Sequence, residues 1–504
     1  MSQLANDPNQ LVRRPVNRPA VPSVGAGGRY AIRPVELPDS IRRKHIICYG
    51  ETGAGKTTLL ERLIWTDLVR RLTGKSQRGV AVVDVIGDLS RNFLARAALL
   101  RRQLTVEHRR LLDQILYIVE PKRPGWTVAY DPFEVRPGES PESRADHLSA
   151  AVSVMYHDDP TLTVRQKRVI KHAALALIIR GKGLRDIPKF LTDSAYREEV
   201  VTSTRHPNLK QYWFGEFPTL ERQILERVES TANRLDLLFD EDIEEMLTGP
   251  STIDFRKAMD DGAFIICRIP RHKLGEGAAY LLGAFIVEEL KQAASGRLDV
   301  SYSSRRPFTI VLDEYQHLTT DSILQGVEGS RKVALELILA TQEVKGRPTE
   351  EHIRRAIRKI AGSILTFRVS YEDARTLAPD IFNPDLEQVK HVSIRYQKVP
   401  SWFGEYAQRF EDPVFRGMDE IWEREIRRIT NLPDRTFWFR TKGDPHAYVV
   451  ETPPVKSIED LADPDDLALA SNEQNEAAFR LAGRRKFKKL PTPTTSSHSN
   501  IWGP

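Results

Sequence analysis

The chain has 504 residues, 40% of them hydrophobic and 29% charged, a balance typical of a globular protein of roughly three domains. Lys and Arg number 75 and Asp and Glu 69, and the resulting charge of +6 fits a mixed surface at least as well as a nucleic-acid partner. The two cysteines, Cys48 and Cys267, exclude a disulfide scaffold and fit a reducing compartment. The longest apolar run, 278–287, is about half the length of a membrane-spanning helix, and the N-terminus lacks a signal-peptide pattern. We therefore expect a cytoplasmic protein without a membrane span of its own.

The first part of the chain changes from an irregular arm to a regular alternation of elements. Residues 1–40 are rich in Pro, Arg, Asn and Gly without periodicity, which predicts a flexible N-terminal arm. Beyond it, short apolar runs alternate with helical patterns, as in a parallel sheet that helices cover on both faces. The predicted strands are 45–49, 79–85, 115–119, 263–268, 308–312, 335–341 and 363–369. The sequence therefore predicts an α/β domain with a mostly parallel, doubly wound sheet.

Helical periodicity replaces this alternation in the middle of the chain, which predicts an inserted all-α domain at 141–250. Its predicted helices are 143–156, 163–180, 185–201 and 217–247. The two halves of the sheet domain are then 41–140 and 251–455, and we interpret 385–450 as an extra packed layer rather than a partner-binding face. Residues 456–504 are predicted as a helical segment and a disordered basic tail that includes Arg484, Arg485, Lys486, Lys488 and Lys489.

A phosphate-binding pattern follows the first predicted strand. Residues 50–57, Gly-Glu-Thr-Gly-Ala-Gly-Lys-Thr, match Gly-x-x-x-x-Gly-Lys-[Ser/Thr] and precede an amphipathic helix. Backbone N–H groups at a helix N-terminus cradle phosphate oxygens, Lys56 would reach the β- and γ-phosphates, and Thr57 would ligate Mg²⁺. The alternative is a Gly-rich turn with a solvated lysine. The predicted nucleotide-binding residues are Gly50, Thr52, Gly53, Ala54, Gly55, Lys56, Thr57 and Thr58.

Two adjacent carboxylates, Asp313 and Glu314, follow the apolar strand predicted at 308–312. Because successive side chains of a strand point to opposite faces, we assign Asp313 to Mg²⁺ and Glu314 to orientation of the attacking water. The alternative is an Asp that caps a helix. At the end of the next strand, Gln342 would either sense the γ-phosphate or lie exposed in a loop. Arg331 would either complement a helix dipole or act as an arginine finger toward a neighbouring subunit.

These motifs, in this order, resemble the conjugative coupling ATPases of type IV secretion systems, within the FtsK/HerA superfamily of DNA-pumping motors. The resemblance covers about residues 40–380 and extends more faintly to about 450. The stretches that carry it are Gly50–Thr57, Val83–Leu89, Tyr212–Trp213, Leu247–Pro250, Asp260–Pro270, Leu274–Gly283, Val311–Gln316, Ser330–Lys332, Ala340–Gln342, Phe367–Val369 and Glu372–Ala374.

The resemblance implies a RecA-like P-loop core with an inserted all-α domain, assembled as a hexameric ring that hydrolyses ATP with Mg²⁺ to move DNA. It also implies that Gln342 senses the γ-phosphate and that Arg331 acts in trans. Relaxosome and secretion-channel proteins are the implied partners, and any docking at the inner membrane would depend on them.

The sequence also departs from the family. Asp84-Val-Ile-Gly87 stands where the family often has Asp-Pro-x-Gly, which puts the rigidity of that turn in doubt, and the N-terminal membrane helices of many members are absent. Two other hypotheses stay open. One is a nucleotide-gated adaptor that recruits DNA-processing protein cargo, and the other is a HerA-like motor of a mobile element or defence system.

Overall fold

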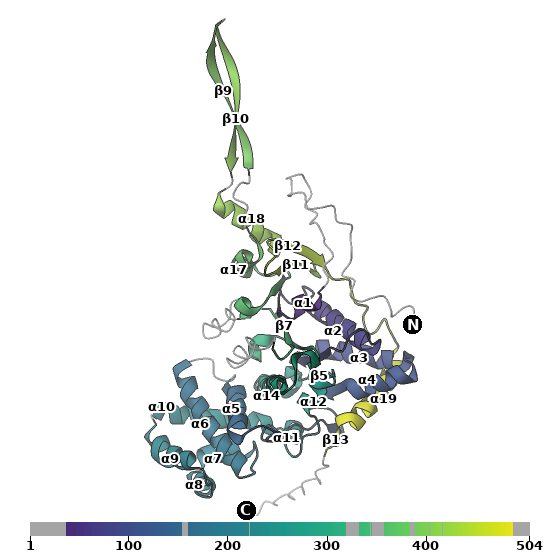
Figure 1. The fold of residues 1–504 in the computed structure, drawn as a ribbon, viewed down its shortest axis with the longest axis vertical. Helices are drawn as coiled ribbons and strands as arrows, with labels where there is room; N and C mark the ends of the chain where they lie inside the picture. The colour runs from purple at the N-terminus through teal and green to yellow at the C-terminus, as the bar shows by residue number, and fades with distance from the viewer. Residues whose placement is uncertain are drawn as a thin grey trace, which may run out of the picture.

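The computed structural model describes residues 37–153, 160–220, 222–318, 332–342, 344, 357–383, 389–402, 404–415 and 417–486. Within these ranges a nine-stranded sheet forms the centre of the molecule (Figure 1). In spatial order its strands are β12 (Ala447–Glu451), β11 (Thr436–Thr441), β8 (Ser363–Thr366), β1 (Ile46–Tyr49), β7 (Leu335–Thr341), β6 (Phe308–Asp313), β2 (Gly79–Asp84), β5 (Phe264–Arg268) and β3 (Leu116–Val119). The strands from β8 to β3 are parallel, and β11 and β12 add an antiparallel edge. The predicted mostly parallel sheet is confirmed.

Helices cover both faces of the sheet because its strands are apolar on both faces. Ile46 and Cys48 of β1 pack into one core layer, and the alternating Ile47 and Tyr49 pack into the other. The first layer is closed by α2 (Lys56–Leu72), α3 (Asp88–Gln103), α4 (Val106–Ile115) and α19 (Pro464–Ala482). The second is closed by α12 (Phe255–Asp260), α14 (Glu276–Gly296), α17 (Tyr371–Ile381) and α18 (Met418–Thr430). Shorter segments are α1 (Asp39–Arg42), α13 (Arg271–Leu274) and the 3₁₀ turns η4 (Arg297–Asp299), η5 (Tyr302–Ser304) and η6 (Tyr315–His317).

The helical insertion lies between β3 and α12 in the chain and at one end of the molecule (Figure 1). Two predicted helices are wrong because polar caps interrupt them. Asp193 accepts a hydrogen bond from the Tyr196 N–H at 3.0 Å, and Asp240 accepts one from the Asp242 N–H at 3.2 Å. The elements are α5 (Pro141–Ser153), α6 (Pro160–Ile179), α7 (Asp186–Thr192), α8 (Ser194–Thr202), α9 (Pro207–Gln211), the π-helix η1 (Tyr212–Glu216), η2 (Phe217–Thr219), α10 (Arg222–Leu235), η3 (Asp236–Phe239) and α11 (Glu241–Leu247).

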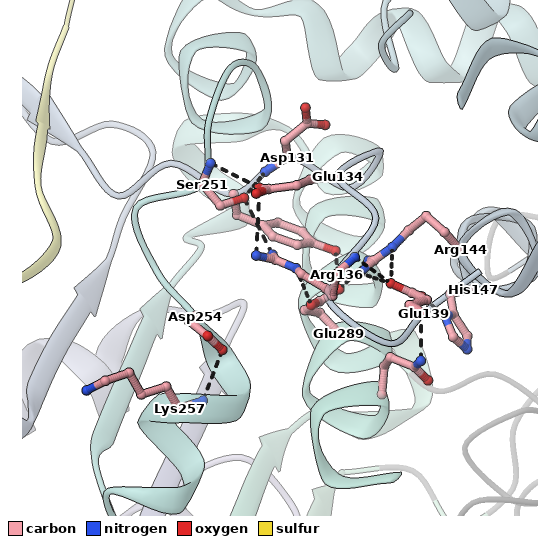
Figure 2. Close-up of polar contacts among 12 residues, drawn as sticks. Asp131, Glu134, Arg136, Glu139, Arg144, His147, Ser251, Asp254, Lys257 and Glu289 are labelled. Carbon is pink, nitrogen blue, oxygen red and sulfur yellow. Dashed lines mark hydrogen bonds and ion pairs between the residues drawn. The ribbon is translucent and has the colours of Figure 1, made fainter. Parts of the chain in front are cut away.

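Buried ion pairs fasten this insertion to the sheet domain, and Figure 2 shows their side chains converging. Arg144 of α5 is only 1% exposed, and its guanidinium lies 2.7 Å from Glu139 and 2.5 Å from Glu289 of α14. The Tyr130 hydroxyl donates to Glu289 at 3.2 Å, and Arg136 lies 3.4 Å from the same carboxylate. We call these five residues the junction cluster. It ties the connection that enters the insertion to a helix of the core.

The region predicted as an extra packed layer, 385–450, forms two different structures. The strands β11 and β12 do extend the sheet as a packed layer. In contrast, β9 (Val389–Ser401) and β10 (Gly404–Phe415) have no strand partners among the described residues except each other, and they form a hairpin that stands out from the body, opposite the helical insertion (Figure 1). Trp402, between the two strands, is 96% exposed. The packed-layer prediction is therefore wrong for the hairpin.

The start of the predicted basic tail is held against the fold. The strand β13 (Arg484–Arg485) pairs with β4 (Trp126–Thr127). Arg484 donates to the Thr248 carbonyl at 2.8 Å, and Lys486 donates to the Pro121 carbonyl at 2.9 Å. The carbonyls just beyond α11 attract cations because they lie at the negative end of the helix dipole. Lys488, Lys489 and most of the predicted N-terminal arm lie outside the described residues.

Across the described ranges, we find no helix whose length and hydropathy would allow it to traverse a lipid bilayer.

Candidate active site

The loop between β1 and α2 needs each glycine of the phosphate-binding pattern. Gly53 and Gly55 have φ angles of 79° and 111°, in the left-handed region that glycine adopts without strain. A Cβ on Gly50 would lie 2.7 Å from the Cβ of Phe367, which is too close for any side chain. Gly55 is also the N-cap residue of α2. The loop therefore sits at the positive end of the helix dipole, where anions bind favourably.

Lys56, the first residue of α2, folds its side chain back over this loop. Its ammonium donates to the carbonyl oxygens of Gly50 and Glu51, the latter at 3.1 Å. Burial lowers the pKa of Lys56, and the carboxylates of Glu314 and Asp313 oppose that lowering. Neutral carbonyls are weaker partners for a cation than phosphate oxygens are. The lysine is thus held beside the loop with partners that a phosphate would replace.

Asp313 and Glu314 end β6 at the same edge of the sheet as this loop, because the carboxyl ends of parallel strands share one edge. Asp313 is 3% exposed, and burial raises its pKa to about 7, with the neighbouring Asp84 and Glu314 adding to the rise and Lys56 opposing it. A bound cation would remove this cost of ionisation. The position therefore suits a carboxylate that ligates a metal ion.

Glu314 is held in a strained conformation with half of its carboxylate unsatisfied. Its φ of 54° is unusual for a residue other than glycine. Oε2 accepts a hydrogen bond from Gln316 at 2.8 Å and one from the backbone N–H of Gln342 at 3.3 Å. Oε1 is buried without a hydrogen-bond partner. The carboxylate thus keeps one oxygen without a partner, which fits the predicted role of orienting a water molecule.

Gln342 connects the phosphate loop with the acidic pair, because β7 lies between β1 and β6 in the sheet. The Thr52 hydroxyl donates to its side-chain oxygen at 2.6 Å, and its backbone N–H contacts Glu314. The structure therefore brings Lys56, Glu314 and Gln342 together at one edge. Arg331 lies outside the described residues, and its role stays a prediction.

Sequence reasoning missed the part that Asp84 plays. Asp84 of β2 pairs in register with Asp313 of β6. Its carboxylate accepts hydrogen bonds from the Gly87 N–H at 2.7 Å and from both the N–H and the hydroxyl of Ser90 at 2.8 Å. These bonds fix the turn that follows β2. An Asp at a strand end with Gly three residues later and Ser six residues later is the signal that points to it.

The side chains at this edge fit a magnesium ion. Thr57 and Thr58 lie partly exposed in the first turn of α2, and the Asp313 carboxylate lies at the end of β6. Mg²⁺ takes oxygen ligands, commonly one or two carboxylates together with substrate phosphates and water. The raised pKa of Asp313 adds to this fit, because a buried carboxylate near two others is stabilised by a cation.

The parallel sheet, the glycine loop before α2 and the acidic pair two strands away define a P-loop nucleoside triphosphatase fold with a helical insertion. The fold is similar to that of the bacterial conjugative coupling protein TrwBdeltaN70 in an unbound monoclinic form, with a TM-score of 0.56 and 15% identity over 84% of this chain and 87% of that chain. TrwB in complex with ADP and Mg²⁺ matches with a TM-score of 0.56 and 15% identity, over 84% of this chain and 88% of the other. TrwB with a non-hydrolysable ATP analogue matches at 0.54 and 14% identity, over 86% and 91%.

The sequence matches no protein-family model and no curated protein. At 14–16% identity, the structural likeness shows the fold alone, and this fold is the one found in the conjugative coupling protein TrwB, as the sequence motifs predict.

Proposed function

We propose that this chain is an ATP-driven DNA translocase of the coupling-protein type, which hydrolyses ATP as part of a ring. The observation that carries the proposal is the meeting of the glycine loop, the acidic pair and Gln342 at one edge of the sheet. The fold shared with TrwB, including a form that holds ADP and Mg²⁺, supports the nucleotide and the metal.

In this proposal the phosphate loop binds the triphosphate and the acidic pair acts on it. Lys56 turns from the loop carbonyls to the β- and γ-phosphates, which are stronger partners. Thr57 and Asp313 would hold Mg²⁺, which would supply positive charge against the phosphate oxygens. Glu314 uses its free Oε1 to orient the attacking water and to accept its proton. The reaction breaks the bond between the β- and γ-phosphates and releases ADP and phosphate.

Two side chains would report the state of the nucleotide. Gln342 contacts both the loop and Glu314, which supports the proposal that its amide responds to the γ-phosphate. Arg331 would reach the site of the neighbouring copy as an arginine finger, which ties hydrolysis to assembly of a hexameric ring. DNA would pass through the ring, and relaxosome or secretion-channel proteins would hold this cytoplasmic motor near the inner membrane.

The test is the ATPase rate of the full chain with and without DNA, measured alongside native mass. We expect hydrolysis that DNA accelerates and a mass of about six copies. DNA affinity should fall steeply with salt, because phosphate contacts release counterions. A slow rate that DNA does not change, from a monomer, would overturn the translocase and favour a nucleotide-gated adaptor.

A further inference from the structure

A loop from the C-terminal part of the chain lies directly against the phosphate loop. This loop, 432–435, joins α18 to β11. The N–H of Arg435 donates to the Ala54 carbonyl at 2.8 Å. A Cβ on Gly55 would lie 2.7 Å from the Cα and 3.1 Å from the Cγ of Arg435. Gly55 is therefore needed for this approach as well as for its own φ angle, and the start of the Arg435 side chain lies over it.

Arg368, which follows β8, ties the two loops together. Its guanidinium lies 2.9 Å from Asp434 and 3.7 Å from the Glu51 carboxylate of the phosphate loop. The Glu51 N–H donates to the Arg368 carbonyl at 2.9 Å. These contacts hold the 432–435 loop against the phosphate loop.

The conformation of Arg435 is unusual for a side chain that serves only to pack. Its φ of 61° lies in the left-handed region, where glycine would be free of strain. Its Nε is buried without a hydrogen-bond partner. A buried donor left unpaired costs stability unless something else occupies the site. Beside Gly55, the Arg435 guanidinium therefore keeps a donor that the described residues do not engage.

The order of strands indicates which end of a nucleotide lies near Arg435. The strands β7 and β6, which carry Gln342 and Glu314, lie on one side of β1, and β8 and β11 lie on the other. With the γ-phosphate directed toward Glu314, the base and ribose extend in the opposite direction, toward β11. Arg435 immediately precedes β11. It therefore faces the nucleoside end rather than the reacting phosphate.

We propose that Arg435 stacks its guanidinium plane on the base of the nucleotide bound to its own chain. This inference rests on the proposed function only in requiring that the phosphate loop binds a nucleotide. A guanidinium is planar, weakly hydrated and suited to stacking on π systems. Because its plane covers a face of the base, Arg435 acts on nucleotide affinity rather than on the hydrolytic step.

The experiment compares the affinities of variants for two probes, ADP and pyrophosphate, each with Mg²⁺. Arg435→Ala is expected to weaken ADP binding about 5- to 100-fold, as loss of a stacking partner does, and to leave pyrophosphate binding unchanged. Arg435→Tyr should retain most of the affinity for ADP, because it keeps a flat face, whereas Arg435→Lys should behave like the alanine variant. Arg427→Ala, which removes an exposed cation on α18, is the charge-matched control.

Several outcomes would overturn the inference. Equal loss of ADP and pyrophosphate affinity, with rescue by lysine, would assign Arg435 to a phosphate instead. Equal ADP affinity of the wild type and all variants would leave the side chain no role in binding. If the alanine variant does not fold, Arg435→Gly removes the same side chain and suits the backbone. A wild-type chain that binds neither probe would overturn the proposed function and this inference with it.

Discussion

Two buried polar clusters in this molecule differ in how their charges are satisfied. In the junction cluster, Arg144 lies between two carboxylates and each of them faces a cation. At the nucleotide edge of the sheet, Asp313 lies near two further carboxylates, and Glu314 Oε1 has no hydrogen-bond partner. Both clusters are buried, so they do not differ in burial. They differ in whether each charged group has a partner of opposite charge.

The difference distinguishes a group that holds a fold together from one that awaits a ligand. A buried charge with good partners is compensated inside the protein, whereas removal of one partner leaves a costly unpaired charge. A buried charge without partners is already costly, and such groups concentrate where a substrate or metal compensates them. We therefore expect substitutions in the junction cluster to reduce stability and substitutions at the nucleotide edge to reduce activity.

The largest effect on stability is expected from Arg144→Met. Because Arg144 is 1% exposed and contacts Glu139 and Glu289, its loss removes the closest cation from two buried carboxylates, while Arg136 stays 3.4 Å from Glu289. The expected cost is about 3–5 kcal/mol of the free energy of unfolding, measured by urea denaturation. Adding Glu139→Gln and Glu289→Gln to this variant should recover part of the loss. Loss of hydrolysis with unchanged stability would show that the junction cluster serves activity. The two clusters would then not differ in the way that we propose.

The next largest effect is expected from Glu314→Gln, which should reduce activity rather than stability. The variant keeps the shape of the side chain but cannot accept a proton, so hydrolysis should fall about a hundredfold or more while ATP still binds. Steady-state ATPase rates and equilibrium binding of ATP separate the two properties. The control is Asp88→Asn, an exposed carboxylate at the start of α3. Turnover equal to the wild type would refute the role assigned to Glu314.

The raised pKa of Asp313 predicts a pH dependence of stability without nucleotide or Mg²⁺. Its pKa is about 7 in the folded chain and 3.8 ordinarily, so the folded state binds more protons between these values. Stability is therefore lost as pH rises through this window, by up to about 1.4 kcal/mol per pH unit. Asp313→Asn should remove that slope and be more stable than the wild type near pH 8. Parallel stability curves for the two proteins would mean that Asp313 ionises normally.

The strands and the main site residues are predictable from sequence for a local reason. One apolar run precedes the phosphate loop at Gly50 and another precedes the acidic pair at Asp313. Each run predicts a strand and, at its end, the position of the functional residues. Parallel strands then bring these ends to one edge, so Lys56 and Glu314 are found without knowledge of the strand order.

The features that sequence reasoning missed depend on contacts between distant parts of the chain. Nothing in the sequence around Arg435 distinguishes it from other arginines, because its contact with Ala54 of the phosphate loop appears only in the folded chain. Arg484 is predicted as solvated because its partners, the carbonyls beyond α11, lie more than 200 residues earlier in the chain. The end of the predicted helix at Asp193 can be predicted from sequence, because Asp is a common N-cap residue and here precedes Ser-Ala-Tyr.

The smallest expected effect is on stability, and it comes from an exposed ion pair of the helical insertion that can be compared with the buried pairs of Arg144. Lys171 of α6 lies 2.7 Å from Asp146 of α5, close in sequence to Arg144, but the two side chains are 33% and 50% exposed. Water solvates such a pair in both folded and unfolded states, so Lys171→Ala should cost less than about 1 kcal/mol, an effect that added salt diminishes. Urea denaturation at low and high salt measures it beside Arg144→Met. A loss as large as that of Arg144→Met would mean that an exposed ion pair stabilises α5 as much as a buried one does. Burial of the paired charges would then not explain the stability that we assign to the junction cluster.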